Sequence, residues 1–212
     1  MRPFLALFDV DGTLFLTDDP LAGTALRETL ADRYAVELPE DAIDRVDHQG
    51  QTSLHIARLV LANAGVDDAD DLAGWCDHFA ERYIELLAGA DTRDWRAAPD
   101  AEASLEGLAA ANVRLALLTG NPQPMARARL ERLGLARFFP EGQGAFGCES
   151  ESRVELIALA RRRAGDWPAG RTVEIGDTRR DASSSRAAGI RSILVGEDGL
   201  TVDAVQQLLS SA

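Results

Sequence analysis

The chain contains no lysine: all 22 of its basic residues are arginine, against 35 acidic residues in a total of 212. The absence of lysine excludes any mechanism that depends on a lysine amine. The formal net charge of −13 argues against nucleic acid or an anionic membrane as a partner, because both are bound through basic surfaces. A local pocket of arginines can still bind a phosphate group.

Cysteines and long apolar runs are also scarce. Cys76 and Cys148 are far apart and follow no metal-binding spacing, so we expect two reduced thiols in a cytosolic protein. The N-terminal apolar run is broken by Asp9, which indicates neither a signal peptide nor a membrane anchor. No run approaches the ~18 apolar residues of a transmembrane helix. We therefore expect a cytoplasmic protein without a membrane partner.

Buried strands alternate with helices over most of the chain. Five apolar residues at 4–8 predict a strand that is covered on both faces. Further strands are predicted at 113–118, 145–147, 171–176 and 190–195, with helices at 101–111, from Asn121-Pro122 toward Leu133, and at 151–164, 179–188 and from 202 onward. This alternation predicts an α/β fold, a Rossmann-like parallel sheet with helices on both faces.

Residues 18–91 have a different pattern. Apolar residues recur there at helical spacing, most clearly between Trp75 and Leu87, and no buried strand is indicated. We expect an inserted helical cap subdomain at 18–91, and a discontinuous core domain formed by residues 1–17 and 92–212.

Two carboxylates follow the first predicted strand directly, in Asp9-Val10-Asp11-Gly12. Ligands of open α/β sheets bind at the carboxyl ends of the strands. Two anions so close repel each other unless a cation or a shared proton intervenes, and Mg²⁺ prefers oxygen ligands. The pattern also fits a solvated Asp-Gly turn. A calcium loop is excluded, because the twelfth loop position would be Pro20 rather than an acid.

Two more predicted strands end in polar residues. Thr119-Gly120-Asn121 lies at the start of a helix, where free backbone N–H groups can bind a phosphate, although a simple asparagine N-cap explains the same residues. Asp177 and Asp181 follow the strand at 171–176. Together, three strand ends present four acids and a helix start suited to phosphate.

In this order the segments resemble the motifs of the haloacid dehalogenase-like superfamily of phosphohydrolases. Three matches carry the resemblance: Asp9-x-Asp11-Gly12-Thr13 is similar to the first motif, Leu117-Leu118-Thr119-Gly120-Asn121 to the second, and Gly176-Asp177-x-x-x-Asp181 to the fourth. The resemblance covers the whole chain. The helical segment after the first motif is similar to the cap of phosphoglycolate phosphatase-like and phosphoglucomutase-like members.

The resemblance implies a Mg²⁺-dependent phosphatase that hydrolyses a small phosphorylated metabolite, of phosphoglycolate or sugar-phosphate type, through an aspartyl-phosphate. Asp9 would be the nucleophile, and Asp11 the general acid and then the general base. Asp9, the Asp11 carbonyl and Asp177 would hold the metal, while Asp181 orients its water shell. Dehalogenating members lack the second aspartate, so Asp11 favours phosphoryl transfer. Phosphonate-cleaving members need a lysine, which this chain lacks.

The third motif of the family usually supplies a lysine, and Arg153 is the best replacement in this chain. It stands near the start of a predicted helix, 24 residues before Asp177. Arginine can neutralise phosphate and orient Asp9, though its geometry differs from that of lysine. We expect Thr119, Gly120, Asn121 and Arg153 to hold the phosphoryl oxygens. Arg161, Arg162 and Arg163 are expected on a solvated face.

The best candidate for a substrate contact from the cap is the segment 47–53. By resemblance, Gln51 and Thr52 are expected to face the active site. His48 and His55 are possible donors in the pocket, but a histidine on a helix surface is commoner, and we favour that interpretation for His55.

Three other functions fit parts of the pattern. A sugar-phosphate mutase needs the same motifs and differs in how long the aspartyl-phosphate survives. A signalling receiver also accepts phosphate on an aspartate, but it needs a lysine and has no inserted helical segment. A non-catalytic relative would be expected to have lost Asp9, Asp11 or Asp177, and all three are present.

Overall fold

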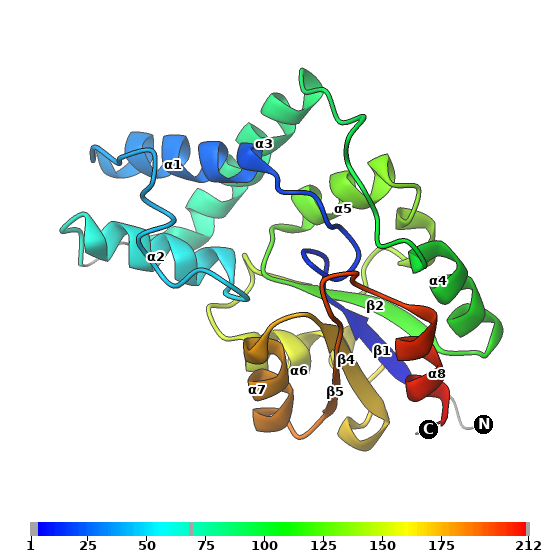
Figure 1. The fold of residues 1–212 in the computed structure, drawn as a ribbon. Helices are drawn as coiled ribbons and strands as arrows, with labels where there is room; N and C mark the ends of the chain where they lie inside the picture. Colours follow the sequence, from blue (N-terminus) through cyan, green and yellow to red (C-terminus); the bar gives the residue numbers. More distant parts are fainter. Residues whose placement is uncertain (1–3, 68–69, 211–212) are drawn as a thin grey trace.

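The computed structural model describes residues 4–67 and 70–210, and within them five strands form one sheet in the order β3-β2-β1-β4-β5 (Figure 1). The strands are β1 (Leu5–Phe8), β2 (Arg114–Thr119), β3 (Ala145–Phe146), β4 (Thr172–Gly176) and β5 (Arg191–Leu194). All four pairings are parallel. The α/β fold expected from the sequence is confirmed, and β1 lies at the centre of the sheet.

Helices cover both faces of the sheet because consecutive strand residues point to opposite sides. On one side, Phe4, Ala6 and Phe8 join one apolar core with α4 (Ala101–Ala110), α5 (Gln123–Arg132) and α8 (Val202–Ser210). On the other, Leu5 and Leu7 pack with α6 (Arg153–Arg163). Beside α6, α7 (Arg179–Ala187) packs on β4 and β5. Two short 3₁₀ helices, Ala136–Phe138 and Ala169–Arg171, complete the core.

Residues 18–91, which we call the cap, contain α1 (Pro20–Tyr34), α2 (Ser53–Asn63) and α3 (Leu72–Ala88), which lie to one side of the sheet (Figure 1). They enclose a second apolar core, in which Trp75 stacks on Phe79 with ring centroids 5.1 Å apart. Met125 of α5 belongs to this second core, so α5 contacts the cap as well as the sheet. The expectation that the stripe from Trp75 to Leu87 packs the cap core is confirmed.

Two chain segments connect the cap to the sheet, and they run side by side. Phe15 forms an isolated antiparallel bridge with Ala97, and the Leu16 N–H donates to the Arg96 carbonyl at 2.9 Å. The division into a cap at 18–91 and a core formed by residues 1–17 and 92–212 remains a proposal. Residues 1–3, 68–69 and 211–212 lie outside the described residues. In the described parts of the chain, no helix is both long and apolar enough to cross a membrane.

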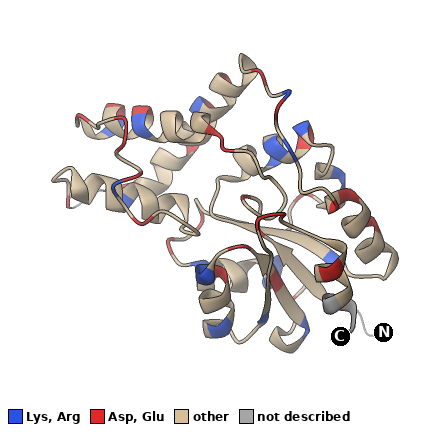
Figure 2. Cartoon of the chain, viewed as in Figure 1, with Lys and Arg blue, Asp and Glu red and all other residues tan. Residues whose placement is uncertain are grey.

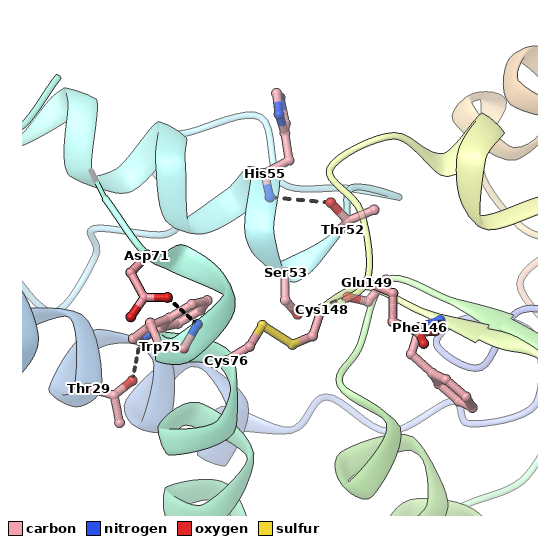
Figure 3. The surroundings of a disulfide bond; sticks show 12 residues. Thr29, Thr52, Ser53, His55, Asp71, Trp75, Cys76, Phe146, Cys148 and Glu149 are labelled. Carbon is pink, nitrogen blue, oxygen red and sulfur yellow. Dashed lines mark hydrogen bonds between the residues drawn. A yellow bond between two sulfur atoms is a disulfide. The ribbon is translucent and has the colours of Figure 1, made fainter. Parts of the chain in front are cut away.

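The expectation of two free thiols is wrong. Cys76 of α3 and Cys148, in the loop after β3, form a disulfide that ties the cap to the core (Figure 3). Their Cα atoms are 5.8 Å apart although 72 residues separate them in the sequence. Spacing alone could not predict this pairing, because the fold brings the two residues together only when the cap packs on the core.

Candidate active site

The predicted acids gather at the carboxyl edge of the sheet. Asp9 follows β1 directly, and its N–H donates to the Ile175 carbonyl of β4 at 2.9 Å. Only 5% of Asp9 is exposed. Asp177 follows β4, and Thr119 ends β2 on the other side of β1. The central strand and its two neighbours therefore bring these residues to one place, as the sequence predicted. Figure 2 shows the acidic residues of the loop after β1.

Three carboxylates are placed to hold a cation. One oxygen each from Asp9, Asp177 and Asp181 lies within 4.8 Å of the others. Asp177 Oδ1 is buried and has no hydrogen-bond partner. A hard divalent cation such as Mg²⁺ would satisfy this oxygen and offset the repulsion among the carboxylates. The donor set therefore fits Mg²⁺. The Asp11 carbonyl as a further ligand stays a prediction.

Gly12 gives Asp177 the space to reach this cluster. Gly12 has φ of +70°, and a Cβ built on it would lie 2.2 Å from Asp177 Oδ2. Any side chain there would push Asp177 aside and would also strain the backbone. The glycine of the first motif is therefore needed for the position of an acid that lies 165 residues later in the sequence.

Burial favours the protonated forms of Asp9 and Asp177. Burial raises the pKa of Asp9 well above its usual value, Arg153 opposes that rise, and Asp181 and Asp11 add to it. Burial, followed by the neighbouring Asp181, also raises the pKa of Asp177. A bound cation would favour the charged forms of both groups.

Asp181 contributes to the start of α7 as well as to the cluster. Its Oδ2 accepts from the Thr178 N–H at 2.8 Å and from the Thr178 hydroxyl at 2.7 Å. The Asp181 N–H in turn donates to Thr178 Oγ1 at 3.2 Å, which completes a capping box. Its Oδ1 lies 2.7 Å from Arg153 Nη2. These contacts support a role in holding the cluster's geometry. The expectation that Asp181 orients the metal's water shell stays a prediction.

Arg153 lies at the base of the cluster, buried at the first residue of α6. Its Nη2 lies 3.5 Å from Asp9 Oδ1 and 3.1 Å from Glu174 Oε1. Burial works against the charge of Arg153, but Asp9, Glu174 and Asp181 together raise its pKa. The guanidinium is therefore fixed beside the predicted nucleophile, as expected for a residue that replaces a lysine.

Glu174 was not identified from the sequence. It lies in the middle of β4, is fully buried, and accepts from Arg153 Nε at 3.1 Å and from the Ser185 hydroxyl. Burial raises its pKa, and Arg153 opposes that rise. A charged residue inside an otherwise apolar strand indicates a buried partner, and that signal could have located it.

Asp11 projects into the cavity, and its side chain is 50% exposed. Arg129 Nη1 donates to its Oδ1 at 2.7 Å, and the Asn121 amide donates to its Oδ2. The expectation that Asn121 caps the following helix is wrong: the N-cap of α5 is Pro122, without a side-chain cap. Instead, the Asn121 amide is directed to Asp11, and its second contact is Thr119 Oγ1, at 3.2 Å.

The contact surface between cap and core passes directly over the second motif. The Gly120 carbonyl accepts from the Ser53 N–H and from the Ser53 hydroxyl, both at 2.8 Å. A Cβ on Gly120 would lie 2.0 Å from the Gln51 carbonyl, so only glycine permits this approach. Gln51 lines the cavity as expected, whereas the Thr52 hydroxyl accepts from the His55 N–H and caps α2.

Further polar contacts fasten the cap to the core. Arg58 of α2 pairs with Glu151 at 2.6 Å, and His55 lies 3.6 Å from the same carboxylate. On the other side, Arg180 of α7 pairs with Asp47 at 2.6 Å. His48 lines the cavity, and its Nδ1 lies 3.2 Å from the Val46 carbonyl. The preferred interpretation of His55, on a helix surface, agrees with its contact to Glu151.

Cap and core together line an open cavity of about 1440 Å³. The core lines it with Asp9, Asp11, Asn121, Arg129, Arg153 and Asp177, and the cap with residues of α1 and of the segment 40–51. The cavity therefore joins the acidic cluster, two buried arginines and a polar cap surface. This arrangement can bind a phosphate, supply a carboxylate nucleophile and present an exposed carboxyl group for proton transfer.

Comparison with known families and structures agrees with this arrangement. The profile of the haloacid dehalogenase-like hydrolases matches residues 5–189, and the chain belongs to this family. A phosphoglycolate phosphatase of Rhodospirillum rubrum is 32% identical over 203 residues, which cover 91% of this chain and 79% of the relative. A phosphoglycolate phosphatase of Agrobacterium fabrum is 26% identical, over 89% of this chain and 78% of the relative. The protein is a phosphatase of this family.

Solved structures share the fold. CbbY from Rhodobacter sphaeroides, crystallised with phosphate, superposes with a TM-score of 0.67 at 23% identity, over 92% of this chain and 87% of that one. A β-phosphoglucomutase from Clostridium difficile superposes with a TM-score of 0.71 at 15% identity, over 99% and 98% of the two chains. At these identities the likeness concerns the fold alone.

Proposed function

We propose that this phosphatase hydrolyses a small phosphorylated metabolite, of phosphoglycolate or sugar-phosphate type, through a phosphoryl group carried on Asp9. The observation that carries the proposal is the geometry around Asp9. A buried carboxylate at the end of the central strand lies beside Arg153, within the acidic cluster, and two residues before an exposed carboxylate, Asp11.

Each residue has a defined task in this reaction. The Asp9 carboxylate attacks phosphorus, and the bond to the leaving oxygen breaks as that oxygen takes a proton from Asp11. Asp11 then removes a proton from water, which attacks the same phosphorus and frees Asp9. Arg153, Thr119 and the Gly120 N–H hold phosphoryl oxygens. Mg²⁺, held by Asp9, Asp177 and the Asp11 carbonyl, would neutralise the charge of nucleophile and phosphate.

The position of the cap favours a small substrate over a large one. It contacts the second motif through Ser53 and Gln51, so a large phosphorylated chain would have to separate these contacts to reach Asp9. Two curated relatives are named phosphoglycolate phosphatases, which supports that substrate class. We also propose a cytoplasmic location. That compartment usually keeps thiols reduced, whereas Cys76 and Cys148 are joined in this structure.

The test is release of inorganic phosphate from a panel of small phosphomonoesters, with Mg²⁺ and with EDTA, for the wild type and Asp9→Asn. We expect metal-dependent release by the wild type and none by the variant. Thermal unfolding with and without Mg²⁺ measures metal binding independently of turnover. Conversion of a sugar phosphate to its isomer without phosphate release would instead establish the mutase alternative. Phosphate release that Asp9→Asn retains would contradict the proposal.

A further inference from the structure

Arg129 is buried at the junction of cap and core, although it belongs to a core helix. Its side chain is 3% exposed, and it lies on the face of α5 that also buries Met125, Ala126 and Leu130. A charged group in such a position is costly unless every donor finds a partner. The partners of Arg129 therefore show what it does.

One end of the guanidinium is anchored by Asp19 and by two aromatic rings. Nε and Nη2 donate to Asp19 Oδ2 at 3.1 and 2.8 Å, and the Tyr83 hydroxyl donates to the same oxygen at 2.7 Å. Asp19 is itself fixed, because its Oδ1 caps α1. The rings of Phe15 and Tyr83 lie 5.1 and 5.4 Å from the guanidinium carbon, which adds cation–π attraction.

The other end of the guanidinium reaches Asp11. Nη1 donates to Asp11 Oδ1 at 2.7 Å, while Asn121 holds the second oxygen. Asp11 is half exposed and would otherwise rotate freely in the cavity. A carboxylate held at both oxygens has one orientation, and a proton donor must lie in the right direction to act.

We infer that Arg129 is a positioning residue, which orients the Asp11 carboxyl group toward the leaving oxygen and is itself held by Asp19 and Tyr83. The inference rests on the proposed role of Asp11. Arg129 touches neither the phosphoryl group nor the cation in this account. It acts through Asp11, and its loss reduces the efficiency of proton transfer rather than the binding of phosphate.

Substrates with different leaving groups can distinguish a positioning role of Arg129 from a purely structural one. An alkyl phosphate needs a proton donor when its bond breaks, whereas p-nitrophenolate leaves without one. The ratio kcat/KM reports the steps up to loss of the leaving group, before the water attacks. We therefore compare kcat/KM for an alkyl phosphate, such as phosphoglycolate, with kcat/KM for p-nitrophenyl phosphate, in the wild type, Asp11→Asn and Arg129→Gln.

Removal of a general acid typically costs about 10²–10⁴-fold, and misplacement of one by about 1 Å can cost about 10²-fold. We expect Arg129→Gln to lower kcat/KM about 10- to 100-fold for the alkyl phosphate and much less for the aryl phosphate. Asp11→Asn is expected to show the same selectivity, but a larger loss. Arg58→Gln is the matched control, because Arg58 is another arginine between cap and core and does not contact the acidic cluster. This variant should change kcat/KM only slightly, and equally for the two substrates.

Arg129→Lys covers the case in which Arg129→Gln does not fold. A single ammonium cannot pair with Asp19 and Asp11 as the guanidinium does, so an intermediate but still selective loss is expected. Suppose that Asp11→Asn lowers kcat/KM mainly for the alkyl phosphate. If the folded Arg129 variants then lower kcat/KM equally for both substrates, the inference is wrong. If Asp11→Asn itself is not selective, the proposed role of Asp11 fails instead.

Discussion

Core and cap contribute to the cavity through different kinds of contact. The core supplies Asp9, Asp177 and Arg153, all fixed by strand ends or by a helix start. The cap supplies mostly docking contacts: the Ser53 pair on the Gly120 carbonyl, the Arg58–Glu151 ion pair and the Cys76–Cys148 disulfide. In the proposed function the chemistry is therefore located in the core, and the cap would control access and placement. Substitutions in the two regions should have different consequences.

The largest effect is expected from Asp9→Asn in the core. The amide is close in shape but cannot attack phosphorus, so we expect activity to fall by about 10⁴-fold or more, as for loss of other nucleophiles. Circular dichroism and thermal unfolding check that the variant is folded. Relief of carboxylate repulsion should leave it at least as stable as the metal-free wild type, and a strongly destabilised variant would contradict this picture of the cluster.

Arg153→Met should damage both catalysis and the fold. Loss of the guanidinium leaves Glu174, Asp181 and Asp9 facing one another in a buried site, and breaking such a pair typically costs about 3–5 kcal/mol. Activity should fall by about 10²- to 10³-fold, as for other groups that stabilise developing charge. Urea unfolding and steady-state kinetics measure the two losses. Wild-type kcat in this variant would show that Arg153 is only structural.

The double variant Cys76→Ser, Cys148→Ser tests the covalent tether between cap and core. The disulfide closes a loop across 72 residues, for which chain-entropy estimates give a stabilisation of about 4 kcal/mol. Unfolding in denaturant should show a loss of up to that size, and dithiothreitol should reproduce it in the wild type. Because neither cysteine touches the acidic cluster, phosphate release should survive in the folded variant. Loss of turnover in a variant that remains fully folded would show that the tether is part of the catalytic geometry.

Stabilisation by Mg²⁺ should depend on pH because protons compete for the same carboxylates. Burial raises the pKa of Asp9 and Asp177, so the folded metal-free protein holds protons that the unfolded chain has released. The contribution of these two groups to its stability is therefore fully present below the ordinary carboxyl pKa and is lost as pH rises through the raised value. Mg²⁺ would offset that loss of stability, because it favours the charged forms of Asp9 and Asp177.

The thermal shift produced by Mg²⁺ should accordingly grow over the range in which pH rises from the ordinary carboxyl value of about 4 through the raised one. Differential scanning fluorimetry across this range measures it, with Asp9→Asn as the control whose shift is smaller. A shift that is the same at both ends of the range would contradict the assignment of the cluster as the cation site.

The smallest effect is expected from Arg58→Gln in the cap. The Arg58–Glu151 pair is partly exposed, and such pairs contribute about 0–1 kcal/mol. Urea unfolding should therefore detect little change, and the change should shrink further in salt. A loss well above that range would show that docking of the cap depends on this pair more than its exposure suggests.

The sequence was most informative where function depends on a few adjacent residues. Asp9, Asp11 and Asp177 could be placed because each follows a recognisable strand, and parallel strands bring their ends together. Arg153 could be proposed from the resemblance to the family, as the arginine that replaces the usual lysine upstream of Asp177. The parallel sheet followed from alternating apolar segments, and the helical cap from the spacing between Trp75 and Leu87.

What the sequence did not show depends on contacts between distant elements. Arg129 meets Asp11 and Asp19 only after α5 has packed between the sheet and the cap, and Cys76 meets Cys148 only after the cap has docked. Only Arg129 left a weak local signal, of the kind that Glu174 also left. Arg129 occupies the apolar face of its helix, as Glu174 occupies an apolar strand. A charge in an apolar pattern predicts a buried partner but does not identify it.

The central claim is that Asp9 carries the phosphoryl group, and trapping that group tests it most directly. The protein, mixed with Mg²⁺ and a substrate it turns over, is quenched in acid during turnover, digested and analysed by mass spectrometry. We predict the added mass of one phosphoryl group on the peptide that contains Asp9, and its absence in Asp9→Asn. A phosphoryl group on any other residue would contradict the account, and so would continued turnover by Asp9→Asn.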